Sequence, residues 1–154
     1  NTVVSKFAKR CGAKYRTLFL PEHLSEQAYE AMKDEPIIKE MIELYEQVNI
    51  VVHGIGAAQE MALRRNSTHE EQQLLEQKGA VAEAFGYYFN KDGDIVHHLR
   101  TIGIQLEHVN KAQHVIAIAA GSNKAAAIQA YFKNAVKQTI LITDEQTANT
   151  ILEK

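Results

Sequence analysis

Two short stretches of the chain are apolar almost without a break, and each leads into a glycine-containing turn followed by a helical pattern. They are residues 48–52 (VNIVV), followed by HGIG, and residues 114–120 (HVIAIAA), followed by GSNK. Strands that are apolar on both faces are typical of a parallel sheet covered by helices. The two stretches therefore predict an α/β fold with a mostly parallel sheet flanked by helices.

The remaining patterns extend this alternation along the chain. An Asn-Lys-Asp-Gly turn at residues 90–93 predicts a hairpin. Thr68 and Thr143, each followed by Glu or Gln three residues later, are predicted to cap helices. With no repeat or linker in its 154 residues, the chain is expected to be one domain over residues 1–154. Further strands are predicted over residues 15–20, 81–89, 95–97 and 139–142, and helices over residues 1–11, 25–33, 36–46, 57–65, 68–78, 124–133 and 143–152.

Charge and composition exclude several classes of protein. The net charge is −2, so no basic face favours nucleic acid binding by this stretch. No apolar run approaches the roughly 18 residues of a membrane span, and no signal peptide pattern opens the chain. The single cysteine, Cys11, excludes an internal disulfide and is predicted to be a small buried residue on a helix. A reducing, cytoplasmic location is expected.

The turn at residues 121–124 is the sharpest candidate for a binding site. Gly121, Ser122 and Asn123 join a predicted strand to a helix N-terminus, where unpaired backbone N–H groups and the helix dipole favour an anion. Lys124 adds a positive charge beside them. The same residues also fit a plain turn in which Ser122 or Asn123 caps the helix.

A second candidate is the pair Gly54 and Gly56, which begins like the dinucleotide-binding pattern G-x-G-x-x-G. Gln59 stands where the third glycine should be, so an NAD site is not predicted. The loop instead indicates close approach of the backbone to a ligand, or only a tight turn. In open α/β sheets, ligands bind at the carboxyl ends of the strands. This loop, the segment near residues 83–86 and the loop at residues 121–124 are expected to meet there.

Charged residues near these loops have two interpretations each. Arg64 and Arg65 end a predicted helix, where cations are favoured by the dipole alone. Glu83 lies inside an apolar strand, so it either faces solvent or accepts hydrogen bonds from a ligand. The seven histidines lack the spacing of a metal site, and no metal or cofactor is expected.

Five stretches together resemble the effector-binding domain of SorC-type bacterial transcriptional regulators, and most closely that of members controlling glycolytic genes. The resemblance covers nearly the whole chain in order. It implies a fold similar to the phosphosugar isomerases and deaminases, and a sugar phosphate as effector. The stretches are VVHGIGAAQEMALRRN (51–66), AVAEAFGYYFNKDGDIVHH (80–98), IGIQLEHV (102–109), AAGSNKAAAIQAYF (119–132) and ILITDEQTA (140–148).

The resemblance also assigns roles to the candidate residues. It implies that Lys124 and the turn before it hold one phosphate of fructose 1,6-bisphosphate or a related phosphosugar, and that Arg64 holds the other. Glu83 would accept hydrogen bonds from sugar hydroxyls, and Gly54 and Gly56 would form the pocket wall.

The family further implies partners and a part of the fold that these 154 residues do not contain. Its members carry an upstream helix-turn-helix domain that binds operator DNA, then the first strands of the effector domain. A homo-oligomer, dimer or tetramer, is expected, and no enzyme activity. The alternative is a phosphosugar isomerase or deaminase with Glu83 as general base, for which His53 is the only nearby partner.

Overall fold

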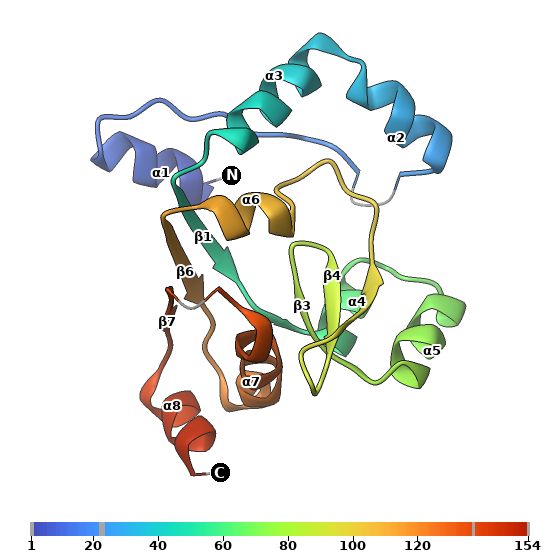
Figure 1. The fold of residues 1–154 in the computed structure, drawn as a ribbon, viewed down its shortest axis with the longest axis vertical. Helices are drawn as coiled ribbons and strands as arrows, with labels where there is room; N and C mark the ends of the chain where they lie inside the picture. The colour runs from blue at the N-terminus through green and yellow to red at the C-terminus, as the bar shows by residue number, and fades with distance from the viewer. Residues whose placement is uncertain (1, 22–23, 137, 154) are drawn as a thin grey trace.

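The computed structural model describes residues 2–21, 24–136 and 138–153, and it confirms an α/β fold with a parallel sheet. Figure 1 shows a parallel sheet and an antiparallel sheet side by side, with α2 and α3 beyond one end of the parallel strands. The helices are α1 (Thr2–Arg10), α2 (Glu26–Lys33), α3 (Pro36–Glu46), α4 (Ala58–Arg64), α5 (His69–Gln77), α6 (Leu106–Lys111), α7 (Ala125–Asn134) and α8 (Glu145–Leu152), with a 3-10 turn at Ser122–Lys124. The strands are β1 (Ile50–Gly54), β2 (Gly56–Ala57), β3 (Ala80–Ala84), β4 (Tyr87–Asn90), β5 (Ile95–His98), β6 (His114–Ile118) and β7 (Thr139–Ile142).

The parallel sheet has the order β1-β6-β7, with β6 in the centre. Its register pairs Val51 with Val115, and Ala117 with Leu141. One face of the sheet is buried: Val115 and Ala117 are both fully buried, and they pack with side chains from α6 and α7. This face carries part of the core, and another buried cluster lies between α4, α5 and the antiparallel sheet.

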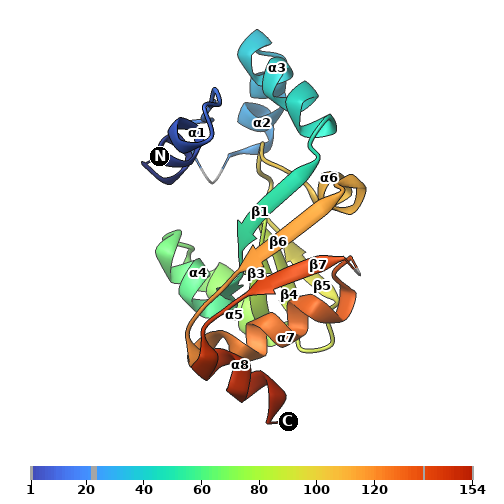
Figure 2. The ribbon, with the colours of Figure 1, turned by 90° about the vertical axis from the view of Figure 1, so that its left-hand side faces the viewer.

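The other face of the parallel sheet is apolar and is not covered by any described element (Figure 2). Five side chains on it are 48–56% exposed. Because successive side chains of a strand point to opposite faces, a run that is apolar throughout creates two apolar faces. The predicted buried strands are therefore covered on one side only. The exposed residues are Ile50, Val52, Ile118, Ile140 and Ile142.

The antiparallel sheet has the order β2-β3-β4-β5 and was predicted only in part. The predicted hairpin at residues 90–93 is confirmed, and Asn90 Oδ1 accepts from the backbone N–H groups of Asp92 and Asp94, both at 2.9 Å. The single strand predicted over residues 81–89 is wrong, because β3 and β4 are joined by a tight turn. Phe85 (φ 59°) and Gly86 (φ 86°) both take the left-handed conformation that such two-residue turns require.

Other local predictions also differ from the structure. Residues 15–20 form no strand, and α6 was not predicted. Cys11 is exposed rather than buried, because only Ala8 of its helical stripe is covered by described residues. The last helix is capped by Asp144, not Thr143. The Thr68 capping box is confirmed.

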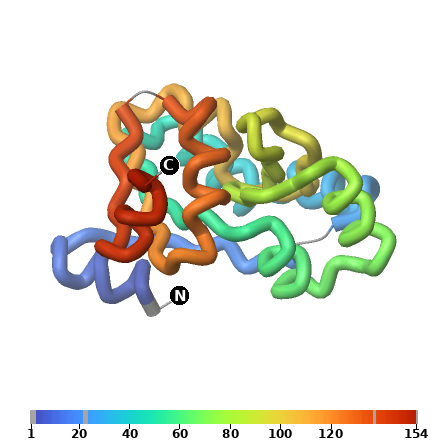
Figure 3. The backbone as a smooth tube through the Cα atoms, turned by 90° about the horizontal axis from the view of Figure 1, so that it is seen from below, coloured from blue at the N-terminus to red at the C-terminus, as the bar shows by residue number. Residues whose placement is uncertain are grey.

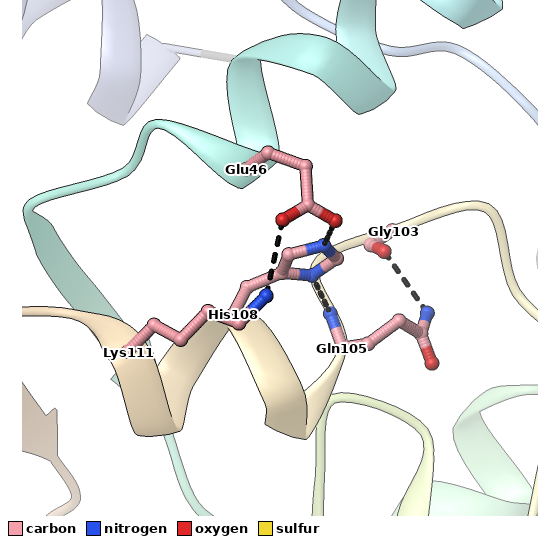
Figure 4. A network of polar contacts seen from close by, with 5 residues as sticks. All are labelled: Glu46, Gly103, Gln105, His108 and Lys111. Carbon is pink, nitrogen blue, oxygen red and sulfur yellow. Dashed lines mark hydrogen bonds and ion pairs between the residues drawn. The ribbon is translucent and has the colours of Figure 1, made fainter.

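A polar network attaches the helical layer of α2 and α3 to the rest of the molecule (Figure 4). Glu46, the last residue of α3, accepts hydrogen bonds from His108 Nε2 and Lys111 Nζ of α6, both at 3.2 Å. The backbone N–H of Gln105 donates to His108 Nδ1 at 2.9 Å, so the ring proton is on Nε2. The hydrogen bonds from Lys111 and His108 lower the pKa of the Glu46 carboxyl.

Candidate functional site

Three connections leave the carboxyl ends of the parallel strands at one edge of the sheet, which faces the viewer in Figure 3. They follow β1 at residues 55–57, β6 at residues 119–124 and β7 at residues 143–144. Ligands bind at this edge in open α/β sheets. The structure therefore brings the two predicted glycine loops together and adds the loop after β7, which was not predicted. The predicted third segment, near residues 83–86, lies instead at the β3–β4 turn of the antiparallel sheet.

The turn after β6 presents unpaired hydrogen-bond donors. Gly121 has φ +113°, and its carbonyl accepts from the backbone N–H of Lys124 at 2.8 Å. Among the residues that the structure describes, the backbone N–H groups of Ser122 and Asn123 have no acceptor, and the Lys124 ammonium has no ion pair. Two backbone donors and a lysine at the start of the ten-residue helix α7 suit an anion.

The N–H of Gly121 is not available to a ligand in this arrangement. It donates to Asp144 Oδ2 at 2.7 Å and to Thr147 Oγ1 at 2.9 Å, both at the start of α8. Hydrogen bonds from the Thr147 hydroxyl, the Thr147 N–H and the Gly121 N–H lower the pKa of the Asp144 carboxyl to about 2. Asp144 is therefore ionised at neutral pH.

The loops after β1 and β6 are in direct contact. Asn123 Nδ2 donates to Glu60 Oε1, in the first turn of α4, at 2.7 Å. A Cβ on Gly56 would collide with the Met61 side chain, so glycine lets β2 and α4 pack closely here. Gly54 is exposed at the end of β1. Packing thus accounts for Gly56, while Gly54 remains accessible to a ligand.

Glu83 is buried, at 4% exposure, next to the Gly56 loop, with which its strand pairs. Its Oε1 accepts from the Gly86 N–H at 2.6 Å and from Arg65 Nη2 at 3.1 Å. Its Oε2 accepts no hydrogen bond from a described residue and faces Gly56, at 3.7 Å from where a Cβ would stand. Of the two interpretations of Glu83, the structure shows the buried one, and one oxygen is left for a ligand.

The structure separates the two adjacent arginines. Arg65 reaches Glu83 and also donates to Tyr88 Oη at 3.4 Å. Burial lowers the pKa of the Arg65 guanidinium, but Glu83 and Tyr88 together raise it by more, so the pKa lies above its ordinary value. Arg64 is exposed and has no hydrogen bond or ion pair to a described residue. Sequence reasoning did not distinguish them, because both end the same helix.

His53 is held by the fold. Its Nδ1 donates to the Gly54 carbonyl at 3.0 Å, and its Nε2 lies 3.2 Å from the Tyr131 hydroxyl. Burial lowers the pKa of His53, although the bond to Gly54 opposes this. Because both ring nitrogens are engaged and Glu83 is paired with Arg65, an acid–base pair for an isomerase is not assembled. No group of three potential metal-ligating side chains occurs in the described part of the chain.

Comparison with known proteins identifies the family. A family model described as "Putative sugar-binding domain" matches residues 1–153. The chain is 43% identical over 152 residues to the central glycolytic genes regulator of Bacillus subtilis (strain 168), covering 99% of this chain and 44% of the relative. It is 30% identical over 130 residues to the transcriptional regulator LsrR of Escherichia coli (strain K12), covering 79% of this chain and 41% of the relative. The chain thus spans less than half the length of these relatives.

Solved structures have the same fold. A crystal structure named "putative SorC family transcriptional regulator from Enterococcus faecalis" is 47% identical, with a TM-score of 0.90, over 99% of this chain and 62% of that one. The full-length sorbitol operon regulator SorC from Klebsiella pneumoniae, at 19% identity, shares the fold with a TM-score of 0.85 over 99% of this chain and 51% of that one. These relatives are named as transcriptional regulators and not as enzymes. No helix in the described residues is both long and apolar enough to cross a membrane. The chain belongs to the sugar-binding domain family of SorC-type transcriptional regulators.

Proposed function

We propose that this chain is the sugar-phosphate-sensing domain of a cytoplasmic transcriptional repressor of glycolytic genes. The observation that carries the proposal is the turn after β6. There Ser122 and Asn123 offer two backbone N–H groups beside Lys124, at the edge of the sheet where ligands bind. The family and the names of the relatives supply the sugar and the regulatory role.

The ligand is fructose 1,6-bisphosphate or a related phosphosugar. Lys124 and the turn formed by Gly121, Ser122 and Asn123 hold one phosphate. Arg64, which is exposed and has no described partner, holds the second phosphate as a bidentate donor.

Between the phosphates, Glu83 selects the sugar. Its Oε2 accepts from sugar hydroxyls, while Arg65 and Gly86 keep Oε1 in place. Gly54 and Gly56 form the neighbouring wall of the pocket.

The intact protein contains more of this domain and a helix-turn-helix domain that binds operator DNA. Two features support the presence of more of this domain: β1 is an edge strand of the described sheet, and no described element covers the apolar sheet face in Figure 2. Additional strands and helices fit such a face, because soluble proteins rarely expose large apolar patches. The sugar phosphate acts by its preference for one state of a dimer or tetramer, and this preference changes affinity for DNA.

A thermal-unfolding titration tests the proposal on the intact protein and on this chain. A ligand at about 100 times its Kd adds roughly 2.7 kcal/mol of stability. We expect such a shift with fructose 1,6-bisphosphate, its loss in Lys124→Ala and Arg64→Ala, and its persistence in Lys91→Ala, an exposed lysine on the β4–β5 turn. An equal shift in Lys124→Ala, or conversion of fructose 6-phosphate to another sugar, would contradict the proposal.

A further inference from the structure

The side chains of Asp144 and Thr147 form a closed set of hydrogen bonds beneath the turn after β6. The Thr147 hydroxyl donates to Asp144 Oδ2 at 2.7 Å, and the Thr147 N–H donates to Asp144 Oδ1 at 2.8 Å. The Gly121 N–H donates to both side chains. Thr147 has no exposed surface, so these hydrogen bonds belong to the buried interior of the fold.

These bonds hold Gly121 from one side, and the turn holds it from the other. Its N–H is fixed by α8, and its carbonyl accepts from the Lys124 N–H at 2.8 Å. With φ +113°, Gly121 has a conformation that favours glycine. Fixing both of its peptide groups determines where the next two N–H groups, those of Ser122 and Asn123, point.

A carboxylate beside a phosphate site would normally repel the ligand. Here both oxygens of Asp144 accept hydrogen bonds, and the charge lies at the N-terminus of α8, where the helix dipole offsets it. Asp144 can therefore shape the turn while most of its charge is compensated within the protein.

We propose that Asp144 and Thr147 are positioning residues for phosphate binding, which act through Gly121 on the donors of Ser122 and Asn123. This inference rests on the proposed function, because it concerns the same anion site. It places α8 in the machinery that recognises the phosphate, although neither residue contacts the ligand.

The test is isothermal titration of the intact protein with fructose 1,6-bisphosphate, using four variants. Thr147→Val and Asp144→Ala should weaken binding about tenfold or more, as expected for loss of a hydrogen bond to a charged or buried group. Thr147→Ser should restore the affinity, because it keeps the hydroxyl. Thr150→Val, the same type of change one turn further along α8, should stay within about twofold of the parent, since Thr150 bonds only to Gln146 in the described residues.

Two further measurements separate positioning from general destabilisation. Combined with Lys124→Ala, Thr147→Val should lose most of its effect on binding, because both act at the same phosphate. By NMR and without ligand, the Gly121 amide should exchange with solvent faster in Thr147→Val than in Thr150→Val.

The outcomes distinguish this inference from the proposed function. If the parent protein binds no phosphosugar, the proposed function fails and the inference fails with it, even if the Gly121 amide exchanges faster in Thr147→Val than in Thr150→Val. If the parent binds and Thr147→Val binds equally well, or Thr150→Val loses as much affinity, only the positioning role is overturned.

Discussion

Replacement of Arg65 by Met should destabilise the fold strongly, although the same change at Arg64 should not. The Glu83 side chain is 4% exposed, and that of Arg65 is 13% exposed. Without Arg65, the Glu83 carboxylate keeps one described donor, the Gly86 N–H, in a site closed to most solvent. Removing one partner of a buried ion pair costs about 3–5 kcal/mol, a large part of the roughly 5–15 kcal/mol that stabilises a domain.

A double-mutant cycle isolates the contribution of the pair. Glu83→Gln keeps the shape of the side chain but removes its charge, so Arg65→Met should cost less in that background than in the parent. We expect a coupling energy of about 1–3 kcal/mol. The measurement is urea unfolding followed by circular dichroism at pH 7, with midpoints compared at constant m-value.

The control is the neighbouring arginine. Arg64 is exposed and has no described partner, so Arg64→Met should change the unfolding free energy by no more than about 0.5 kcal/mol. If Arg65→Met and Arg64→Met cost the same, or if the cycle is additive within about 0.5 kcal/mol, the ion pair does not support the fold as argued.

Three further predictions concern pH and backbone conformation. The pKa of the Asp144 carboxyl is lowered from 3.8 to about 2, so its contribution to stability is present above pH 3.8 and is lost as the pH falls toward 2. Asp144→Asn should therefore make stability depend less on pH in this range, measured as acid unfolding by circular dichroism. Burial lowers the pKa of His53, so the unfolded state takes up this proton first and stability should decrease as the pH falls below about 6.5; His53→Gln should reduce that slope in urea unfolding at pH 7 and pH 5. Gly93→Ala should cost about 1–3 kcal/mol of unfolding free energy in the same assay, because φ is +86° and a Cβ would lie 2.8–3.0 Å from atoms of α7. Gly79→Ala is the control: φ is +66° and a Cβ would have no atom within 4 Å, so it should cost only about 1–2 kcal/mol for its conformation.

Local patterns were sufficient to predict the strand-end loops, but not the partners of their charged residues. A continuous apolar strand followed by Gly121 and a helical pattern is a local signal, and the structure confirms each part of it. Arg64 and Arg65 give the same local signal, two cations at a helix C-terminus. Which of them meets Glu83 depends on how α4 packs on β3, and this is a tertiary contact between segments 18 residues apart.

Two of the predictions from sequence were wrong because a tertiary contact overrides a valid local pattern. Thr143 and Gln146 fit a capping box, yet Asp144 and Thr147 form the cap because they also bind Gly121, which precedes them by more than 20 residues. A bulky residue such as Phe85 is unusual at positive φ, so its sequence favours an unbroken strand. The pairing of β3 with β4 imposes the turn instead.

The charged residues of the proposed site fall into two groups that indicate which part of a ligand supplies its affinity. Glu83 and Asp144 already accept hydrogen bonds from within the fold. The side chains of Lys124 and Arg64 have no hydrogen bond or ion pair to a described residue. If the proposed site is correct, phosphates meet both cations without breaking an ion pair, whereas a neutral sugar gains only the free oxygen of Glu83. We accordingly expect the phosphates to provide most of the binding free energy, and Glu83 to discriminate among sugars that carry them.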